Sequence, residues 1–368
     1  MRPRIIFLLL FVLLALPMWA NPQQDKAAAG KGDGSTKDAP SDSRKQPDSE
    51  KENWGVLNDL TTGLGIPSYT EFARDEQPEF VRQVIRMQWR AHDPIDLWVI
   101  RPKVNGKVPV VLYLYGNYDN GDRFRDNGWC KRATAGGFAA VGFVSDLTDY
   151  RFRFRPLKQW FVSELAESIG STVHDAQFIL NYLTDRGDMD MDHVGMFGMG
   201  SGATIAILAA QADQRIKTLD LLDPWGDWPA WLKQSPLIGE DERSKYLTPE
   251  FLKSVSTLDP VAYLPSLKTQ HIRLQQTLSE PETPKAAKDR IAAALPDPTE
   301  LAQYATPMDM LKSWQTTGLS GWIKQQMRPN LPKDGSDEGK VALSGTAPAP
   351  GNSDAKRPSD KNDETLKP

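Results

Sequence analysis

A short apolar strand that runs into a glycine-rich turn and then an apolar helix is the feature that most constrains this fold. Residues 194–197 have the composition of a buried strand, and Gly198-Met199-Gly200-Ser201-Gly202 follows directly. The next eight residues, ATIAILAA, are apolar almost all round a helix. A helix of this kind packs under the centre of a sheet. The sequence therefore predicts a strand–turn–helix unit in the core.

Strand-like and helix-like segments alternate through the middle of the chain. Helices are predicted around residues 129–135 and over 163–184, the second with apolar residues three and four apart on one face. This alternation is typical of a mostly parallel sheet with helices on both faces. Eight strands are predicted, of which the first two form a hairpin and the second is antiparallel: 84–89, 95–100, 108–115, 138–144, 194–197, 217–222, 272–278 and 300–304.

Both ends of the chain differ from the middle in composition. Residues 1–20 contain Arg2 and Arg4, then an apolar run, and end on the small residue Ala20. This pattern predicts a secretory signal peptide, and an uncleaved membrane anchor is the alternative. Residues 21–53 hold no Val, Ile, Leu or aromatic residue, and 330–368 are similar in character. Both segments are predicted to be disordered, because they cannot bury enough apolar surface to offset their ordering entropy.

The folded part is therefore predicted to be one domain over residues 54–329, with a lid-like, Trp-rich insertion at about 225–258. The protein is expected to be exported, periplasmic or secreted, with no stable membrane span once the signal is cleaved. No block of Lys and Arg accompanies aromatic residues, so no nucleic-acid partner is predicted. The single Cys130 is expected to be a small buried side chain on a helix.

The chain from about residue 84 to 310 resembles α/β-hydrolases of the dienelactone hydrolase and platelet-activating-factor acetylhydrolase type. In that superfamily a G-x-S-x-G elbow holds the nucleophile on a strained turn between strand and helix. Here Gly198 and Gly202 stand four apart and fix the register, so the nucleophile position falls on Gly200. The resemblance implies a mostly parallel, eight-stranded sheet with helices on both faces, and a catalytic triad that lacks its nucleophile.

Ser201 follows the nucleophile position by one residue. Either its hydroxyl satisfies a free backbone N–H at the helix N-terminus, or it is the nucleophile of an active enzyme. A shift of one residue on a helix turns the side chain by about 100°, away from the position that the family uses.

Two residues are candidates for the triad acid. Asp223 lies in Leu-Asp-Pro-Trp, which is similar to the acid motif of the acetylhydrolase group. Glu280 follows the next strand, where dienelactone-type relatives carry their acid. Each residue could instead be a helix-capping or loop carboxylate, and the sequence leaves both alternatives open.

The family's basic histidine is missing. The segment that matches it places Asp309 at the base position, and the chain has no His after His271. His271 and His193 are expected at the far end of the sheet from the elbow, with His174 on a covering helix and His92 in the first hairpin. The resemblance assigns the oxyanion loop to Gly116 and Asn117.

No cofactor and no metal are predicted, although Asp188, Asp190, Asp192 and His193 lie close together before a strand. Trp225, Trp228 and Trp231 recur every three residues, a spacing that favours packing between a lid and the sheet over an open ligand cleft. Two hypotheses follow. The first is a catalytically degenerate hydrolase that binds an unknown small molecule or protein; the second is an active carboxylic-ester hydrolase that uses Ser201.

Overall fold

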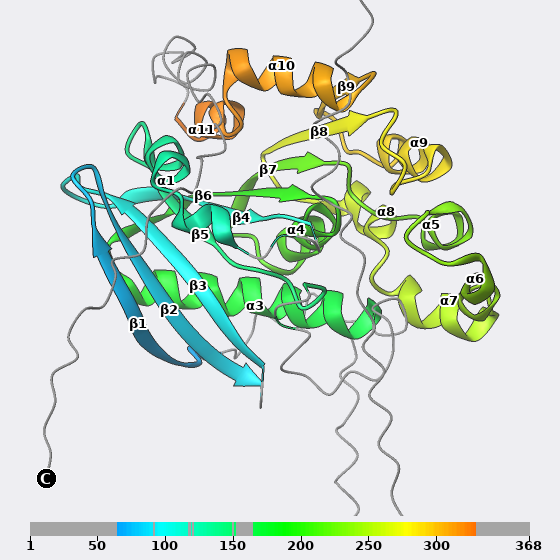
Figure 1. Cartoon of the computed structure of the whole chain (residues 1–368), viewed down its shortest axis with the longest axis horizontal. Coiled ribbons are helices and arrows are strands. Elements are labelled where there is room, and N and C mark those ends of the chain that lie inside the picture. The colour runs from blue at the N-terminus through cyan, green and yellow to red at the C-terminus, as the bar shows by residue number, and fades with distance from the viewer. Residues whose placement is uncertain are drawn as a thin grey trace, which may run out of the picture. The chain divides into compact units, whose positions relative to one another are not determined.

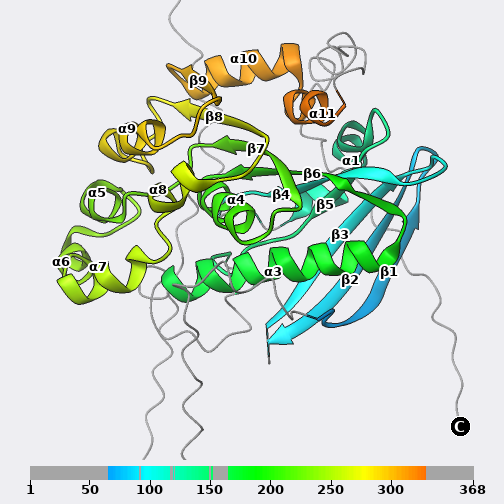
Figure 2. The same cartoon turned by 180° about the vertical axis from the view of Figure 1, so that it is seen from behind.

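The computed structural model describes residues 65–90, 93–116, 119, 121–148, 151 and 165–328 (Figures 1 and 2). The predicted signal peptide (1–20), linker (21–53) and tail (330–368) lie outside the described residues.

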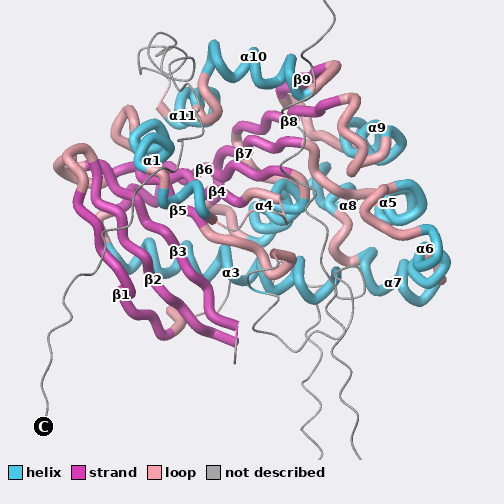
Figure 3. The backbone as a smooth tube through the Cα atoms, viewed as in Figure 1, coloured by secondary structure: helices cyan, strands magenta, loops and turns pink. Residues whose placement is uncertain are grey.

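A nine-stranded sheet forms the centre of the described part (Figure 3). Its strand order is β1-β2-β3-β5-β4-β6-β7-β8-β9. Strands β4 to β9 run parallel to one another, and β1, β2 and β3 are joined antiparallel at one end of the sheet. The bounds are β1 Ser68–Glu76, β2 Phe80–Arg90, β3 Asp93–Pro102, β4 Val108–Leu114, β5 Ala139–Gly142, β6 Met189–Met199, β7 Ile216–Leu222, β8 His271–Thr277 and β9 Glu300–Tyr304.

The prediction of eight strands was wrong by one. All eight predicted strands are present, and β3 is antiparallel to both of its neighbours, as predicted. The additional strand is β1, which extends the first hairpin by pairing antiparallel with β2. Its residues, SYTEFARDE, are exposed at all but one position. Backbone pairing and polar contacts of exposed side chains, such as Asp75 with Arg82, hold this edge strand without an apolar pattern, so its sequence gave no signal.

Helices cover both faces of the sheet (Figures 1 and 2). Helices α3 and α4 pack on one face, and α1 and α11 pack on the other. The insertion at 225–258 contains three helices. The bounds are α1 Asn127–Thr134, α3 Leu165–Arg186, α4 Ser201–Ala212, α5 Trp228–Gln234, α6 Glu240–Tyr246, α7 Pro249–Ser256, α8 Pro260–Tyr263, α9 Lys285–Ala293, α10 Pro307–Thr317 and α11 Gly321–Met327, with short 3₁₀ helices η3 Asp122–Arg125 and η4 Leu264–Ser266.

Helix α4, the helix of the predicted strand–turn–helix unit, is almost entirely buried. It contacts β6 and β7 on one side and α3 on the other, and every residue except Gln211 is buried. This confirms that the all-apolar segment after the glycine-rich turn packs beneath the sheet.

The start of α4 lies directly against the end of β4. A β-carbon on Gly202 would lie 2.2 Å from the Leu114 carbonyl oxygen and 2.7 Å from the Tyr115 carbonyl oxygen. Both neighbours are backbone atoms, which no rotamer change can move away. Glycine at this position therefore permits the approach that fixes the strand–turn–helix junction.

We expect Gly202→Ala to destabilise the fold severely, because the added methyl overlaps backbone atoms of β4. Overpacking of this kind costs about 3 kcal/mol or more, which lowers the melting temperature by roughly 6–12 °C. Gly65→Ala is the control, since a β-carbon there has no heavy atom within 4 Å. Equal melting temperatures for the two variants, measured by circular dichroism, would contradict this account of the junction.

Candidate active site

Gly200 forms the turn between β6 and α4 with φ 56° and ψ −123°. The positive-φ turn predicted at this residue is therefore present. The Gly200 amide donates to the Leu222 carbonyl oxygen at 2.8 Å, which fixes the turn to the end of β7. A β-carbon on Gly200 would meet Trp225 Nε1 at 3.6 Å and Gly116 Cα at 3.9 Å, both ordinary contacts. The position that carries the nucleophile in the resembling family thus has space for a side chain and has none.

Gly116, the first residue of the predicted oxyanion loop, lies beside this turn, whereas Asn117 lies outside the described residues.

Ser201 is the first residue of α4 and is fully buried. The N-cap residue of α4 is Gly200, which has no side chain, so Ser201 is not the N-cap residue of this helix. Within the described ranges, its Oγ has no hydrogen-bond partner. The hydroxyl is therefore neither exposed to a substrate nor bonded there to a base.

Asp223 directly follows β7, and the last residue of that strand pairs with Met199 of β6. Asp223 and Gly200 thus lie side by side at the carboxyl edge of the sheet. The Asp223 Oδ1 accepts a hydrogen bond from the Thr277 amide at 2.8 Å, and its backbone has φ 45°. Burial raises the pKa of Asp223 to about 6, against the opposing effects of that amide and of Lys288. Positive φ in a non-glycine residue costs about 1–3 kcal/mol, so the surrounding contacts must hold this conformation.

Lys288 of α9 is buried beside this carboxylate. Its ammonium donates to the carbonyl oxygens of Thr277 at 2.5 Å and Glu280 at 2.6 Å. The same nitrogen lies 3.5 Å from Glu280 Oε2 and 3.9 Å from Asp223 Oδ1. Lys288 therefore connects the turn after β8 to the residue after β7. Sequence reasoning missed it, because a lysine in a short polar helix resembles a solvated surface residue.

Glu280 is bound within its own turn. Its Oε1 accepts from the Glu282 amide at 2.5 Å and its Oε2 from the Thr283 amide at 3.2 Å. Of the two alternatives for this residue, the geometry is that of a loop carboxylate. Burial, together with the charges of Glu280 and Asp223, raises the pKa of Glu282 to about 7.

Asp309 lies in the first turn of α10, on the surface. The Thr306 hydroxyl donates to Asp309 Oδ2 at 2.7 Å, and the Asp309 amide approaches Thr306 Oγ1 at 3.3 Å. This hydrogen bond lowers the pKa of Asp309, with a smaller effect from Lys312. The residue at the family's base position is thus part of a helix cap.

The described histidines lie where the sequence placed them. His193 and His271 belong to the amino-terminal parts of β6 and β8, at the far end of those strands from Gly200. His193 Nδ1 lies 2.8 Å from Asp190 Oδ2. His174 is buried in α3, and burial lowers its pKa to about 4. His92 lies outside the described residues.

The three tryptophans of the insertion are packed, as predicted. Trp225, Trp228 and Trp231 are each at most 1% exposed. The ring centroids of Trp225 and Trp231 lie 4.8 Å apart, and those of Trp228 and Trp231 lie 5.8 Å apart. The Trp225 carbonyl oxygen also accepts from the Thr204 hydroxyl at 2.7 Å, which connects this cluster to α4.

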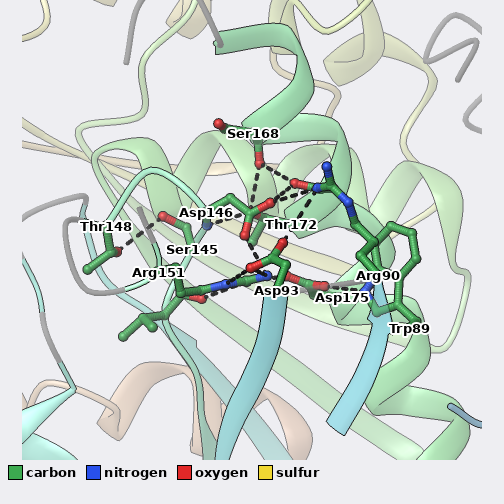
Figure 4. A network of polar contacts seen from close by, with 12 residues as sticks. Trp89, Arg90, Asp93, Ser145, Asp146, Thr148, Arg151, Ser168, Thr172 and Asp175 are labelled. Carbon is green, nitrogen blue, oxygen red and sulfur yellow. Dashed lines mark hydrogen bonds and ion pairs between the residues drawn. The ribbon is translucent and has the colours of Figure 1, made fainter. Parts of the chain in front are cut away.

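A buried ion-pair network lies along the same carboxyl edge, near the start of β3 and the end of β5 (Figure 4). Arg151 Nη2 lies 3.0 Å from Asp93 Oδ1 and 2.5 Å from Asp146 Oδ1, and its Nη1 lies 2.5 Å from Asp175 Oδ2. Burial alone would lower the pKa of Arg151, but the three carboxylates outweigh it and raise that pKa. The residues come from segments far apart in sequence, so no local pattern indicated the network.

Cys130 is buried in α1, as predicted, with its Sγ 3.3 Å from the Phe124 carbonyl oxygen. In the part of the chain that the structure describes, no group of three or more His, Cys, Asp or Glu side chains could hold a metal ion. None of the described helices combines the length and the apolar character that crossing a bilayer requires.

Comparisons with known proteins identify the fold. No protein-family model matches the chain. It is 24% identical over 187 residues to the Bacillus subtilis (strain 168) protein named "Putative hydrolase YtaP", a match that covers 45% of this chain and 60% of that protein. Among solved structures, it is similar to acetyl xylan esterase 1 of Thermoanaerobacterium sp. JW/SL YS485, with 13% identity and a TM-score of 0.58 over 75% of this chain and 92% of that one.

Two further structures are similar in the same way. The acetyl xylan esterase of Paenibacillus sp. R4 gives 15% identity and a TM-score of 0.57 over 74% of this chain and 92% of that one. The acylaminoacyl peptidase of Pyrococcus horikoshii gives 15% identity and a TM-score of 0.53 over 72% of this chain and 44% of that one. The chain therefore has the α/β-hydrolase fold, as predicted. Likeness at this identity shows the fold alone.

We expect the Asp223→Asn variant to gain stability relative to wild type as the pH rises from 4 to 7. The folded-state pKa of Asp223, about 6, lies above its ordinary value of 3.8. The wild-type free energy of unfolding therefore falls as the pH rises through this range, by at most about 3 kcal/mol. Asparagine keeps the acceptor for the Thr277 amide and tolerates positive φ. Urea unfolding at several pH values measures the difference.

Asp309→Asn is the control for this titration, because the pKa of Asp309 is lowered and its pH dependence has the opposite sign. A stability difference between Asp223→Asn and wild type that falls with rising pH would show that the folded state instead stabilises the Asp223 anion.

Proposed function

We propose that this chain is an exported α/β-hydrolase-fold protein that binds a small molecule or a protein partner without catalysing hydrolysis. The observation that carries the proposal is the glycine at the elbow. Gly200 has the positive-φ backbone that holds a nucleophile in the resembling family, and it supplies no nucleophilic atom. The turn is thus kept for its role in folding, in the absence of the side chain that would perform the chemistry.

The geometry around the other two triad positions also supports this proposal. Asp309 at the base position is a partly exposed capping residue, and no described histidine approaches Gly200 along β6 or β8. Asp223 is held at the carboxyl edge beside the elbow, where open α/β sheets bind their ligands. The retained acid and the vacant nucleophile position together favour a binding site derived from a catalytic one.

The alternative, an active carboxylic-ester hydrolase, requires Ser201 as nucleophile with Asp223 or Glu280 as the acid. A serine hydroxyl needs an adjacent base and access to the substrate carbonyl. Ser201 is fully buried, and its Oγ bonds to no described residue. Glu280 is occupied by amides of its own turn. The structure therefore favours the binding protein over this enzyme.

We expect purified protein to turn over activated short-chain esters negligibly and to remain unlabelled by a fluorophosphonate probe. In serine hydrolases, loss of the nucleophile or the base costs about 10⁶ in kcat. Spectrophotometric assay and intact-protein mass spectrometry measure the two outcomes. Ser201→Ala should match wild type in both. Stoichiometric labelling that Ser201→Ala abolishes would establish the active enzyme and refute the proposal.

We expect Gly200→Ser to be less stable than wild type and still inactive. The elbow has room for the side chain, so the cost is backbone strain of about 1–3 kcal/mol at positive φ. The melting temperature should fall by about 2–12 °C.

The double variant Gly200→Ser with Asp309→His adds a histidine at the base position. Esterase activity in the double variant that both single variants lack would show that the acid and oxyanion parts are functional. A gain in stability for Gly200→Ser would contradict the assignment of Gly200 to a strained elbow.

A further inference from the structure

A small cavity lies on the α1 and α11 face of the sheet, the face opposite α4. It has a volume of about 150 Å³ and is lined by Tyr113, Trp129, Arg132, Ala133, Leu319 and Ser320. A cavity of about this volume in another protein is large enough to bind benzene. The space therefore accommodates one aromatic ring.

The walls of this cavity are aromatic and rigid. Tyr113 of β4 is buried, and its ring meets that of Trp129 of α1 in an edge-to-face contact with centroids 5.1 Å apart. Ala133, one turn along α1, presents only a methyl group and leaves the space open. A ring in the cavity would contact both aromatic side chains, and contacts of this kind stabilise ring pairs.

Two polar side chains that have no partner among the described residues complete the lining. Arg132 belongs to the last turn of α1 and lines the cavity. It forms no ion pair with any described residue. Ser320 is only 6% exposed, and its hydroxyl makes no hydrogen bond within the described ranges. Lys324 adds positive charge nearby, since its ammonium donates to the Arg132 carbonyl oxygen at 2.8 Å. A guanidinium and a hydroxyl at one cavity match a carboxylate.

We propose that this cavity binds a small aromatic carboxylate of the size of benzoate. The ring packs against Tyr113 and Trp129, and the carboxylate accepts hydrogen bonds from Arg132 and Ser320. None of the residues that line this site belongs to the elbow, so the proposal is independent of whether the elbow is catalytic.

The test measures 4-fluorobenzoate binding to the full-length protein by ¹⁹F NMR titration, with fluorobenzene as the uncharged comparison. We expect saturable binding with a roughly millimolar Kd, and binding of fluorobenzene at least about tenfold weaker. Arg132→Gln should weaken 4-fluorobenzoate about tenfold and leave fluorobenzene unchanged. Arg290→Gln is the matched control, because Arg290 also occupies the last turn of a helix and lies outside the cavity.

Two further variants fill the space from opposite sides. Ala133→Leu and Leu319→Trp should each abolish binding of both compounds while circular dichroism confirms that the variant is folded. Two variants guard against the failure of one to fold. Unchanged affinity in a folded cavity-filling variant, equal effects of Arg132→Gln and Arg290→Gln, or no saturable binding would each overturn the proposal.

Discussion

The close approach of α4 to the end of β4 is the constraint on which the arrangement of the candidate site depends. Gly202 has backbone carbonyl oxygens where any other residue would place a β-carbon. The chain can make this approach only by turning sharply after β6, and Gly200 makes that turn at positive φ. The tight turn therefore has a packing role that does not require a nucleophile at Gly200.

Buried charge organises the rest of the carboxyl edge. Lys288 joins the turn after β8 to Asp223, and Arg151 joins three carboxylates from separate segments. Removing one partner from such a group leaves an uncompensated buried charge, which costs about 3–5 kcal/mol. Both clusters therefore connect segments that are distant in sequence along this edge of the sheet.

The elbow and the small aromatic cavity lie in different parts of the fold. Gly200 and Asp223 lie side by side at the carboxyl edge of the sheet, and the Thr204 hydroxyl connects α4 to the packed tryptophans of the insertion. The cavity lies on the α1 and α11 face of the sheet, and Arg132 gives it a cationic group. No residue that lines the cavity belongs to the elbow.

The sequence by itself determined the fold class, eight of the nine strands and the position of the elbow, because these features depend on local apolar patterns and on the spacing of glycines. It also placed Asp223 beside Gly200, since parallel strands end at the same edge. Only the tertiary structure decided the exposed edge strand β1, the burial of Ser201 and the role of Lys288. Each of these depends on contacts between distant segments: backbone pairing and side-chain contacts with β2 hold β1, packing encloses Ser201, and carbonyl oxygens of a separate turn bind Lys288.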